Sequence, residues 1–205
     1  MKLGIFGGTF DPPHLGHLLV AAEAYQALSL DKLIFVPNYQ NRLKTNRPQA
    51  SPEDRRIMLF YMLNDFHSEG MSLTCSNVEL ESGAPCATID TMEYFAKVYK
   101  KEKENLFFIM GADNIASLKN WIRTQDYKNV CQTALVQRGG DAIPISPDEL
   151  AQLHEWHNLH FVKSPIRIEV SSTEIRKRID EKKPFFHLLS PSVYAYIKKR
   201  NIYHV

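Results

Sequence analysis

Short apolar runs rich in β-branched and aromatic residues alternate along this chain with amphipathic segments. Two of those segments have a clear helix start, because Ser51-Pro52 and Ser190-Pro191 place a capping serine before a proline suited to the first helical turn. Parallel strands need such helical crossovers. The alternation therefore predicts an α/β, Rossmann-like parallel sheet covered by helices on both faces. The expected strands are Leu3–Phe6, Leu33–Val36, Leu106–Met110, Ala134–Val136 and Ile166–Val170.

Length and composition predict one domain, residues 1–205. The chain of 205 residues has the size of a single domain, and its 44% hydrophobic and 23% charged residues are ordinary for a globular protein. The formal net charge of +2 argues against a polybasic binding surface, so we expect no nucleic acid among the partners. Any anion-binding site must therefore be formed by a few residues in one place and not by an overall positive charge.

Neither a signal-peptide pattern nor an apolar run near the roughly 18 residues of a membrane span is present. We therefore expect a cytoplasmic protein with no membrane partner. Cys75, Cys86 and Cys131 are odd in number and form no C-x-x-C pair, which argues against a disulfide framework and a thiolate zinc site. No interface pattern stands out, so the sequence leaves a homo-oligomer open.

The first expected strand runs directly into Gly7-Gly8-Thr9-Phe10, and a helix is expected over Leu18–Leu28. The glycines allow a tight turn close to a ligand, and the helix would offer free N–H groups to a phosphate. His14 and His17 would project to the same side if both lie in the first helical turn. This segment predicts an anion cradle; a metal-binding histidine pair and ordinary packed or surface histidines are the alternatives.

A second helix start follows the last expected strand. The segment Ser171–Arg176 is Ser-Ser-Thr-Glu-Ile-Arg, in which the first serine and the glutamate fit a capping box. Its hydroxyls, its arginine and the helix N-terminus would suit phosphate oxygens, although a well-capped helix alone explains the same pattern. Two helix-terminus anion sites after two different strands favour a nucleoside triphosphate that bridges them.

Other candidates follow the remaining strands. Asp113, after Gly111, would suit ribose hydroxyls or an N-cap. Lys44 lies in a long loop, Asn38–Ser51, where it would contact phosphates or solvent. Trp121 would stack on a ligand ring or belong to the core.

The triplet His154, His157 and His160 suggests a metal site. A spacing of three drifts around a helix, and a strand is expected to begin near His160. We therefore expect ordinary surface histidines in this otherwise irregular region, which begins at Gly139 and includes a short helix.

The motifs G-G-T-F-D-P-P-H-L-G-H, G-A-D after a central strand and S-S-T-E-I-R occur in that order. Together they resemble the nucleotidyltransferase superfamily, and specifically bacterial nicotinate-nucleotide adenylyltransferases, over nearly the whole chain. This resemblance implies an enzyme of NAD synthesis that converts ATP and nicotinate mononucleotide into the deamido dinucleotide and pyrophosphate. It also implies Mg²⁺ bound mainly through the ATP phosphates, with no metal ligands from the protein.

The resemblance implies roles for individual residues. The catalytic residues would be His14, His17, Lys44 and Arg176. The ATP-binding residues would be Gly7, Gly8, Thr9, Phe10, Gly111, Asp113, Ser172 and Thr173, and the residues that bind nicotinate mononucleotide would be Thr88, Trp121 and Arg138. The chain departs from the family twice: Asn41–Lys44 replaces a loop that often ends Pro-Pro-His-Lys, and Ala87 stands where an aromatic residue often precedes Thr88.

Three alternatives remain at this stage. Another superfamily transferase, such as a phosphopantetheine adenylyltransferase, would share the phosphate site. A catalytically silent nucleotide-binding protein would bind ATP without releasing pyrophosphate, and a metal hydrolase would use His14 and His17 as ligands. The preference between acid and amide forms of the mononucleotide stays open, because backbone N–H groups can decide it.

Overall fold

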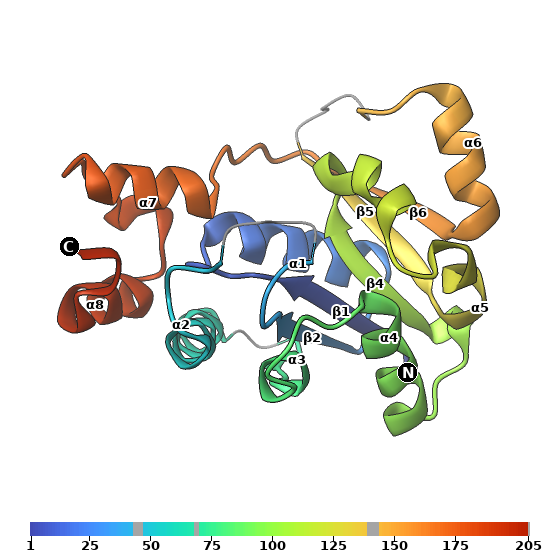
Figure 1. The fold of residues 1–205 in the computed structure, drawn as a ribbon, viewed down its shortest axis with the longest axis horizontal. Coiled ribbons are helices and arrows are strands. Elements are labelled where there is room, and N and C mark those ends of the chain that lie inside the picture. Colours follow the sequence, from blue (N-terminus) through green and yellow to red (C-terminus); the bar gives the residue numbers. More distant parts are fainter. Residues whose placement is uncertain (43–46, 68–69, 139–143, 205) are drawn as a thin grey trace.

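The computed structural model describes residues 1–42, 47–67, 70–138 and 144–204. Its centre is a six-stranded sheet with the order β3-β2-β1-β4-β5-β6, in which every neighbouring pair is parallel (Figure 1). The predicted α/β parallel sheet is therefore confirmed. The strands are β1 (Leu3–Gly8), β2 (Lys32–Pro37), β3 (Leu73–Cys75), β4 (Leu106–Gly111), β5 (Gln132–Arg138) and β6 (Asn158–Ser164).

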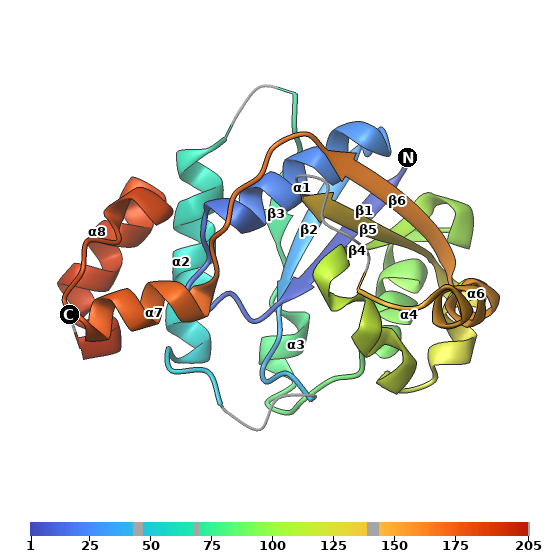
Figure 2. The ribbon, with the colours of Figure 1, turned by 90° about the horizontal axis from the view of Figure 1, so that it is seen from above.

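The central strands are buried on both faces, which explains their continuous apolar sequences. Alternation along β1 sends Leu3 and Ile5 into one hydrophobic cluster and Phe6 into the other. Figure 2 shows helices on both sides of the sheet. One face is covered by α1 (Leu15–Ala27), α2 (Pro52–Asp65), α7 (Ser172–Asp180) and α8 (Pro191–Arg200), and the other by α4 (Thr88–Tyr99), the 3₁₀ helix η2 (Ala112–Asn120), α5 (Tyr127–Val130) and α6 (Pro147–Trp156); α3 (Val78–Glu81) follows β3.

The prediction of a strand over Ile166–Val170 is wrong. The sheet's edge strand is β6, which comes earlier, and the predicted segment forms an irregular connection to α7. Pro165 follows β6 directly and has no N–H to donate to a ladder. Strand β3 was not predicted, because its three residues are too few to show a period.

The helix starts explain how the chain enters the site. Ser51 accepts a hydrogen bond from the Asp54 amide at 3.0 Å and Pro52 occupies the first position of α2, as predicted. Helix α1 begins three residues before the expected Leu18, so its N-cap is His14. None of the helices in the described parts of the chain is both long and apolar enough to cross a membrane.

The C-terminal elements form a separate group at one end of the sheet. Helix α8 packs against α2, and α7 lies nearby, as Figures 1 and 2 both show. After α8 the chain turns through a short 3₁₀ segment, η5 (Ile202–His204), which contacts α7. This arrangement brings the last residues of the chain close to the loop that follows β1.

Candidate active site

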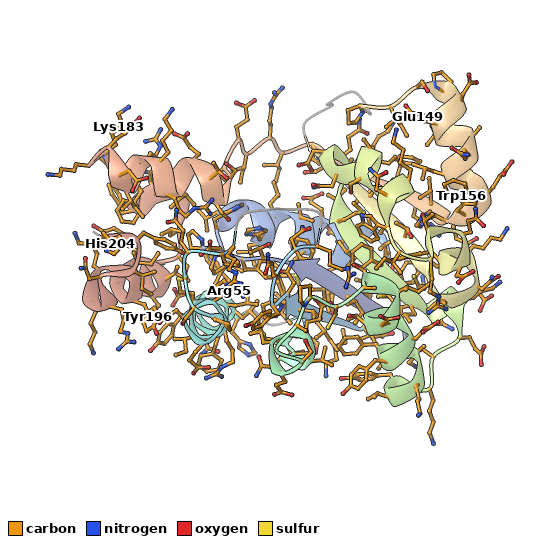
Figure 3. The ribbon with its side chains drawn as sticks, viewed as in Figure 1. Arg55, Glu149, Trp156, Lys183, Tyr196 and His204 are labelled. Carbon is orange, nitrogen blue, oxygen red and sulfur yellow. The ribbon has the colours of Figure 1, made fainter. Side chains whose placement is uncertain are left out.

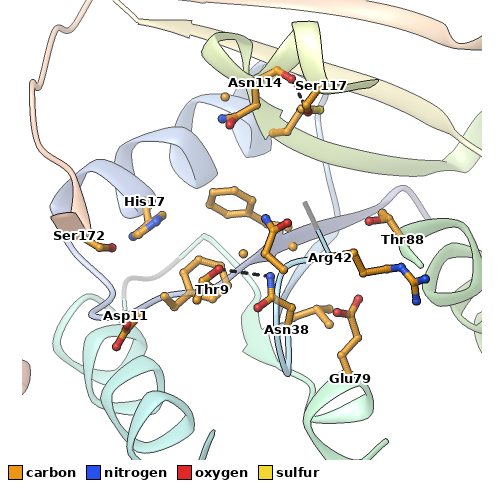
Figure 4. Close-up of a pocket in the computed structure, with 18 of the residues that line it drawn as sticks. Thr9, Asp11, His17, Asn38, Arg42, Glu79, Thr88, Asn114, Ser117 and Ser172 are labelled. Carbon is orange, nitrogen blue, oxygen red and sulfur yellow. Dashed lines mark hydrogen bonds between the residues drawn. The ribbon is translucent and has the colours of Figure 1, made fainter. Parts of the chain in front are cut away.

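A cavity of about 930 Å³ opens at the carboxyl ends of β1 and β4. These two central strands are where the strand order reverses, which is the usual ligand site of an open α/β sheet. In Figure 4, His17, Asp11 and Ser172 lie on one side of the cavity and Thr88 on the other. We call these sides the phosphate end and the acceptor end, after the phosphate-binding and mononucleotide-binding residues that the sequence predicts there.

The loop after β1 forms the floor of the phosphate end. Phe10 has φ of 51°, and its ring is buried against the backbone of Gly8. A Cβ atom at Gly8 would lie 2.8 Å from that ring, so the close packing requires glycine. Gly7, Thr9 and Phe10 also line the cavity, although the Phe10 ring itself belongs to the core.

His14 and His17 lie together at the start of α1. Their rings are stacked, with centroids 3.7 Å apart, and both line the cavity. The His14 backbone N–H donates to His17 Nδ1 at 3.1 Å, which assigns the proton of the neutral His17 ring to Nε2. A Cβ atom at Gly16 would lie 3.1 Å from the His14 ring, so glycine between the histidines leaves room for their stack.

The N-terminus of α7 borders the same end. Ser171 caps the helix, and its hydroxyl accepts from the Glu174 backbone N–H at 3.1 Å. The predicted capping box is incomplete, because the Glu174 carboxylate accepts from Arg178 and not from the Ser171 backbone N–H. Ser172 Oγ donates to the Pro12 carbonyl at 2.8 Å, which joins α7 to the loop after β1. Ser172, Thr173 and Arg176 all line the cavity.

Arg55 is a buried residue of the site that the sequence analysis did not single out. Its Nη1 donates to the carbonyls of Thr9 at 2.8 Å and Asn38 at 2.6 Å, and its Nη2 donates to that of Tyr39 at 3.0 Å. It therefore ties together the loops that leave β1 and β2. Burial lowers the pKa of Arg55, and the nearby Asp11 opposes that effect. A signal existed, because Arg55 occupies the same helical stripe as the buried Met58 and Leu59.

Beyond β4, Gly111 and Asp113 line the cavity. Gly111 is the N-cap of η2, so the N-cap alternative for Asp113 is wrong. A Cβ atom at Gly111 would collide with the Asp113 carboxylate. Glycine is therefore needed for the carboxylate to take its position over the strand end.

The acceptor end is formed by the start of α4, the end of η2 and the loop after β2. Thr88 is the first residue of α4, and Ala87 leaves this N-terminus without a side-chain cap. Trp121 lines the cavity while its ring packs against Phe108 and Tyr127, with centroids 5.3 and 5.6 Å away. The Trp121 ring therefore packs against the core and also borders the cavity, so its stacking on a ligand stays a prediction.

A buried carboxyl group also lies at the acceptor end. Glu79 Oε1 accepts from Thr91 Oγ1 at 2.7 Å, and burial raises the pKa of Glu79. Arg42 lines the same part of the cavity and donates to the Pro85 carbonyl at 2.9 Å. This hydrogen bond links the loop after β2 to the segment that precedes α4.

Two predicted site residues cannot be placed. Lys44 lies outside the described residues. Arg138 ends β5, but its side chain is outside the described part of the structure.

The three late histidines do not converge. His154 is exposed on α6, and His160 pairs with Gln132 on the sheet edge. His157 is only 1% exposed, so the prediction of a surface histidine is wrong there. Its Nε2 and Nδ1 lie 3.0 and 3.2 Å from the hydroxyls of Thr124 and Thr133. Within the described ranges no three His, Cys, Asp or Glu residues group to hold a metal ion.

The fold and the cavity define an α/β protein with an open parallel sheet and a candidate ligand site at its switch point. The cytidylyltransferase-like family model matches residues 5–178. A Dehalococcoides mccartyi protein named "Probable nicotinate-nucleotide adenylyltransferase" is 34% identical over 100% of this chain and 98% of its own length. A Bacillus pumilus protein of the same name is also 34% identical, over 98% of each chain.

A solved structure shows the same fold. The Plasmodium falciparum nicotinic acid mononucleotide adenylyltransferase complexed with NaAD superposes with a TM-score of 0.79 at 19% identity, over 99% of this chain and 97% of that one. The chain belongs to the cytidylyltransferase-like family and, within it, to the nicotinate-nucleotide adenylyltransferases.

Proposed function

We propose that this enzyme transfers the adenylyl group of ATP to nicotinate mononucleotide, giving nicotinate adenine dinucleotide and pyrophosphate in NAD biosynthesis. One cavity contains both the phosphate end and the acceptor end, and this observation carries the proposal. The relatives' names support the same reaction. The structural neighbours were solved with NaAD and with APC, which supports both substrates.

The phosphate end would hold the triphosphate. His17 would donate from Nε2, since its Nδ1 is already an acceptor. Arg176 and the N-terminus of α7, at the same end of the cavity, would add a guanidinium and free N–H groups. Asp113 would accept hydrogen bonds from the ribose of ATP.

The acceptor end would hold nicotinate mononucleotide. Trp121 would stack on the pyridine ring, and Thr88 would lie beside it. Because α4 starts at Thr88 without a side-chain cap, its first N–H groups and its dipole favour a carboxylate there. This favours the acid over the amide form of the substrate.

The reaction needs no nucleophilic side chain. A phosphate oxygen of the mononucleotide attacks the α-phosphorus of ATP, a new P–O bond forms, and the bond from that phosphorus to the α,β-bridging oxygen breaks. Pyrophosphate leaves with that oxygen and its electron pair. The protein contributes alignment of the two phosphates and stabilisation of the charge that develops on the leaving group.

Mg²⁺ would fit this site as a companion of the phosphates. The described lining offers cations and N–H groups with no cluster of three metal-binding side chains, and Mg²⁺ commonly keeps several waters when it binds nucleotide phosphates. Bound there, it would neutralise phosphate charge. His14, His17 and Arg176 would orient the same oxygens from the protein side.

Pyrophosphate release by the purified protein tests the proposal. We expect release with ATP, Mg²⁺ and nicotinate mononucleotide, with the deamido dinucleotide identified by mass, and at least tenfold slower release with the amide. Faster release with phosphopantetheine would reassign the acceptor. ATP binding without release from any of the three acceptors would leave a silent nucleotide-binding protein.

A further inference from the structure

Asp11 is a buried carboxylate at the phosphate end of the cavity. It is 4% exposed and forms part of the cavity wall. Its oxygens accept from the amides of Gln49 at 2.8 Å and Ala50 at 3.0 Å. Those amides lie just before α2, so Asp11 anchors the end of the long loop that follows β2.

Asp11 also holds the arginine of α7. Arg176 Nη1 donates to the Asp11 backbone carbonyl and lies 3.7 Å from its carboxylate. Arg176 Nη2 reaches Thr173 Oγ1 at 3.4 Å. These contacts fix the guanidinium at the wall of the cavity, although α7 is more than 150 positions away in sequence.

The fourth partner of Asp11 comes from the end of the chain. Tyr203 Oη donates to Asp11 Oδ1 at 2.7 Å. Tyr203 is 5% exposed and has φ of 64°, a backbone region that bulky side chains rarely adopt. Burial and the neighbouring carboxylate both raise the pKa of Tyr203, so its hydroxyl stays a donor.

We propose that Asp11 is a positioning residue for adenylyl transfer and that Tyr203 holds its carboxylate in place. This inference rests on the proposed function. The hydroxyl of Tyr203 orients Asp11, Asp11 orients Arg176 and the loop end at Gln49 and Ala50, and these in turn shape the site of the leaving pyrophosphate. The C-terminal segment thereby contributes to the geometry of the active site.

The test compares two tyrosines from the same C-terminal region. Tyr196 Oη donates to Asp54 Oδ1 at 2.8 Å, so Tyr196→Phe and Tyr203→Phe each delete one tyrosine–aspartate hydrogen bond. Tyr196, labelled in Figure 3, lies on α8 and packs against Tyr61 of α2, whereas Tyr203 contacts the site loop. The readouts are kcat, the KM for ATP, the Tm, and the affinity for pyrophosphate with Mg²⁺ measured by calorimetry.

We expect Tyr203→Phe to lower kcat and weaken pyrophosphate binding, each about tenfold, the scale of one hydrogen bond to a charged group. Tyr196→Phe should leave both within about twofold. Asp11→Asn, which replaces one acceptor oxygen with a donor, should lower kcat further than Tyr203→Phe.

Unchanged kcat and pyrophosphate affinity in Tyr203→Phe would overturn the inference. A loss of activity explained entirely by a smaller folded fraction would overturn it too, since the role would then be structural. A wild-type enzyme that releases no pyrophosphate with any acceptor would refute the proposed function instead, and the pyrophosphate-binding comparison would still decide the role of Asp11.

Discussion

The two ends of the cavity are held in different ways. At the phosphate end, buried side chains such as Arg55 and Asp11 connect the loops after β1 and β2 to α7 and the end of the chain. At the acceptor end, the wall includes Thr88, Trp121 and Arg42, and Arg42 is an exposed side chain that donates to the Pro85 carbonyl.

This difference follows from the chemistry each end would perform. Charge develops on the leaving pyrophosphate, and donors that are already fixed stabilise such charge without reorganising during the reaction. Recognition of an acceptor requires a shaped surface more than a fixed charge. Substitutions at the phosphate end should therefore act mainly on kcat, and substitutions at the acceptor end mainly on KM.

The largest effect is expected at the histidine stack. His17→Ala removes a donor at the phosphate end and should lower kcat by about 100-fold or more, the scale for one preorganised donor. Steady-state kinetics would measure it. His154→Ala, an exposed histidine on α6, is the control and should keep the wild-type kcat. A near-normal kcat in His17→Ala would remove the distinction between the two ends.

A smaller effect is expected at the acceptor end. Trp121→Ala should raise the KM for nicotinate mononucleotide about tenfold with a minor change in kcat, because it deletes a stacking surface. The ring also packs against Phe108, so the Tm should fall. Trp121→Phe keeps an aromatic face and should restore most of the affinity. If Trp121→Ala lowered kcat without raising the KM, the assignment of KM effects to the acceptor end would be wrong.

The smallest effect on activity is expected at His157, which lies outside the cavity lining. The Thr124 hydroxyl donates to the Leu118 carbonyl, so His157 Nε2 must donate to Thr124, and Nδ1 accepts from Thr133. That arrangement requires a neutral ring. His157→Gln should keep kcat within about twofold at neutral pH, which makes it a control for the histidine stack.

The same residue predicts a pH dependence of stability. Burial lowers the pKa of His157 to about 4, below the value of about 6.5 expected in the unfolded chain. The unfolded state therefore binds the proton first, and stability falls as the pH drops from about 6.5 towards 4, by about 2 kcal/mol at pH 5. Urea unfolding at pH 7 and pH 5 should show a smaller loss for His157→Gln than for the wild type. Equal losses would refute this assignment.

The sequence predicted the sheet and the local structure around the start of α1 and the start of α7 better than the rest. Local patterns were sufficient there: glycines after a strand, histidines at a helix start and the capped start of α7 are all encoded by neighbouring residues. Strand β3 was missed because three residues show no period. Ile166–Val170 was misassigned because its apolar and polar residues alternate as in a strand, although the segment is an irregular connection.

The contacts that join distant segments could not be predicted in the same way. Asp11 and Tyr203 are 192 positions apart, and no local pattern links them. The helical stripe that Arg55 shares with Met58 and Leu59 indicates burial, but it does not indicate the three carbonyls that the guanidinium contacts. Long-range hydrogen bonds of buried polar groups depend on the completed tertiary structure.

The most direct test of the central claim follows an oxygen atom. ATP labelled with ¹⁸O at the α,β-bridging position would be consumed with nicotinate mononucleotide, and the products analysed by mass spectrometry. Attack on the α-phosphorus predicts the label entirely in pyrophosphate, with none in the dinucleotide. Label recovered in AMP would show cleavage on the other side of the bridging oxygen and would contradict adenylyl transfer in this site.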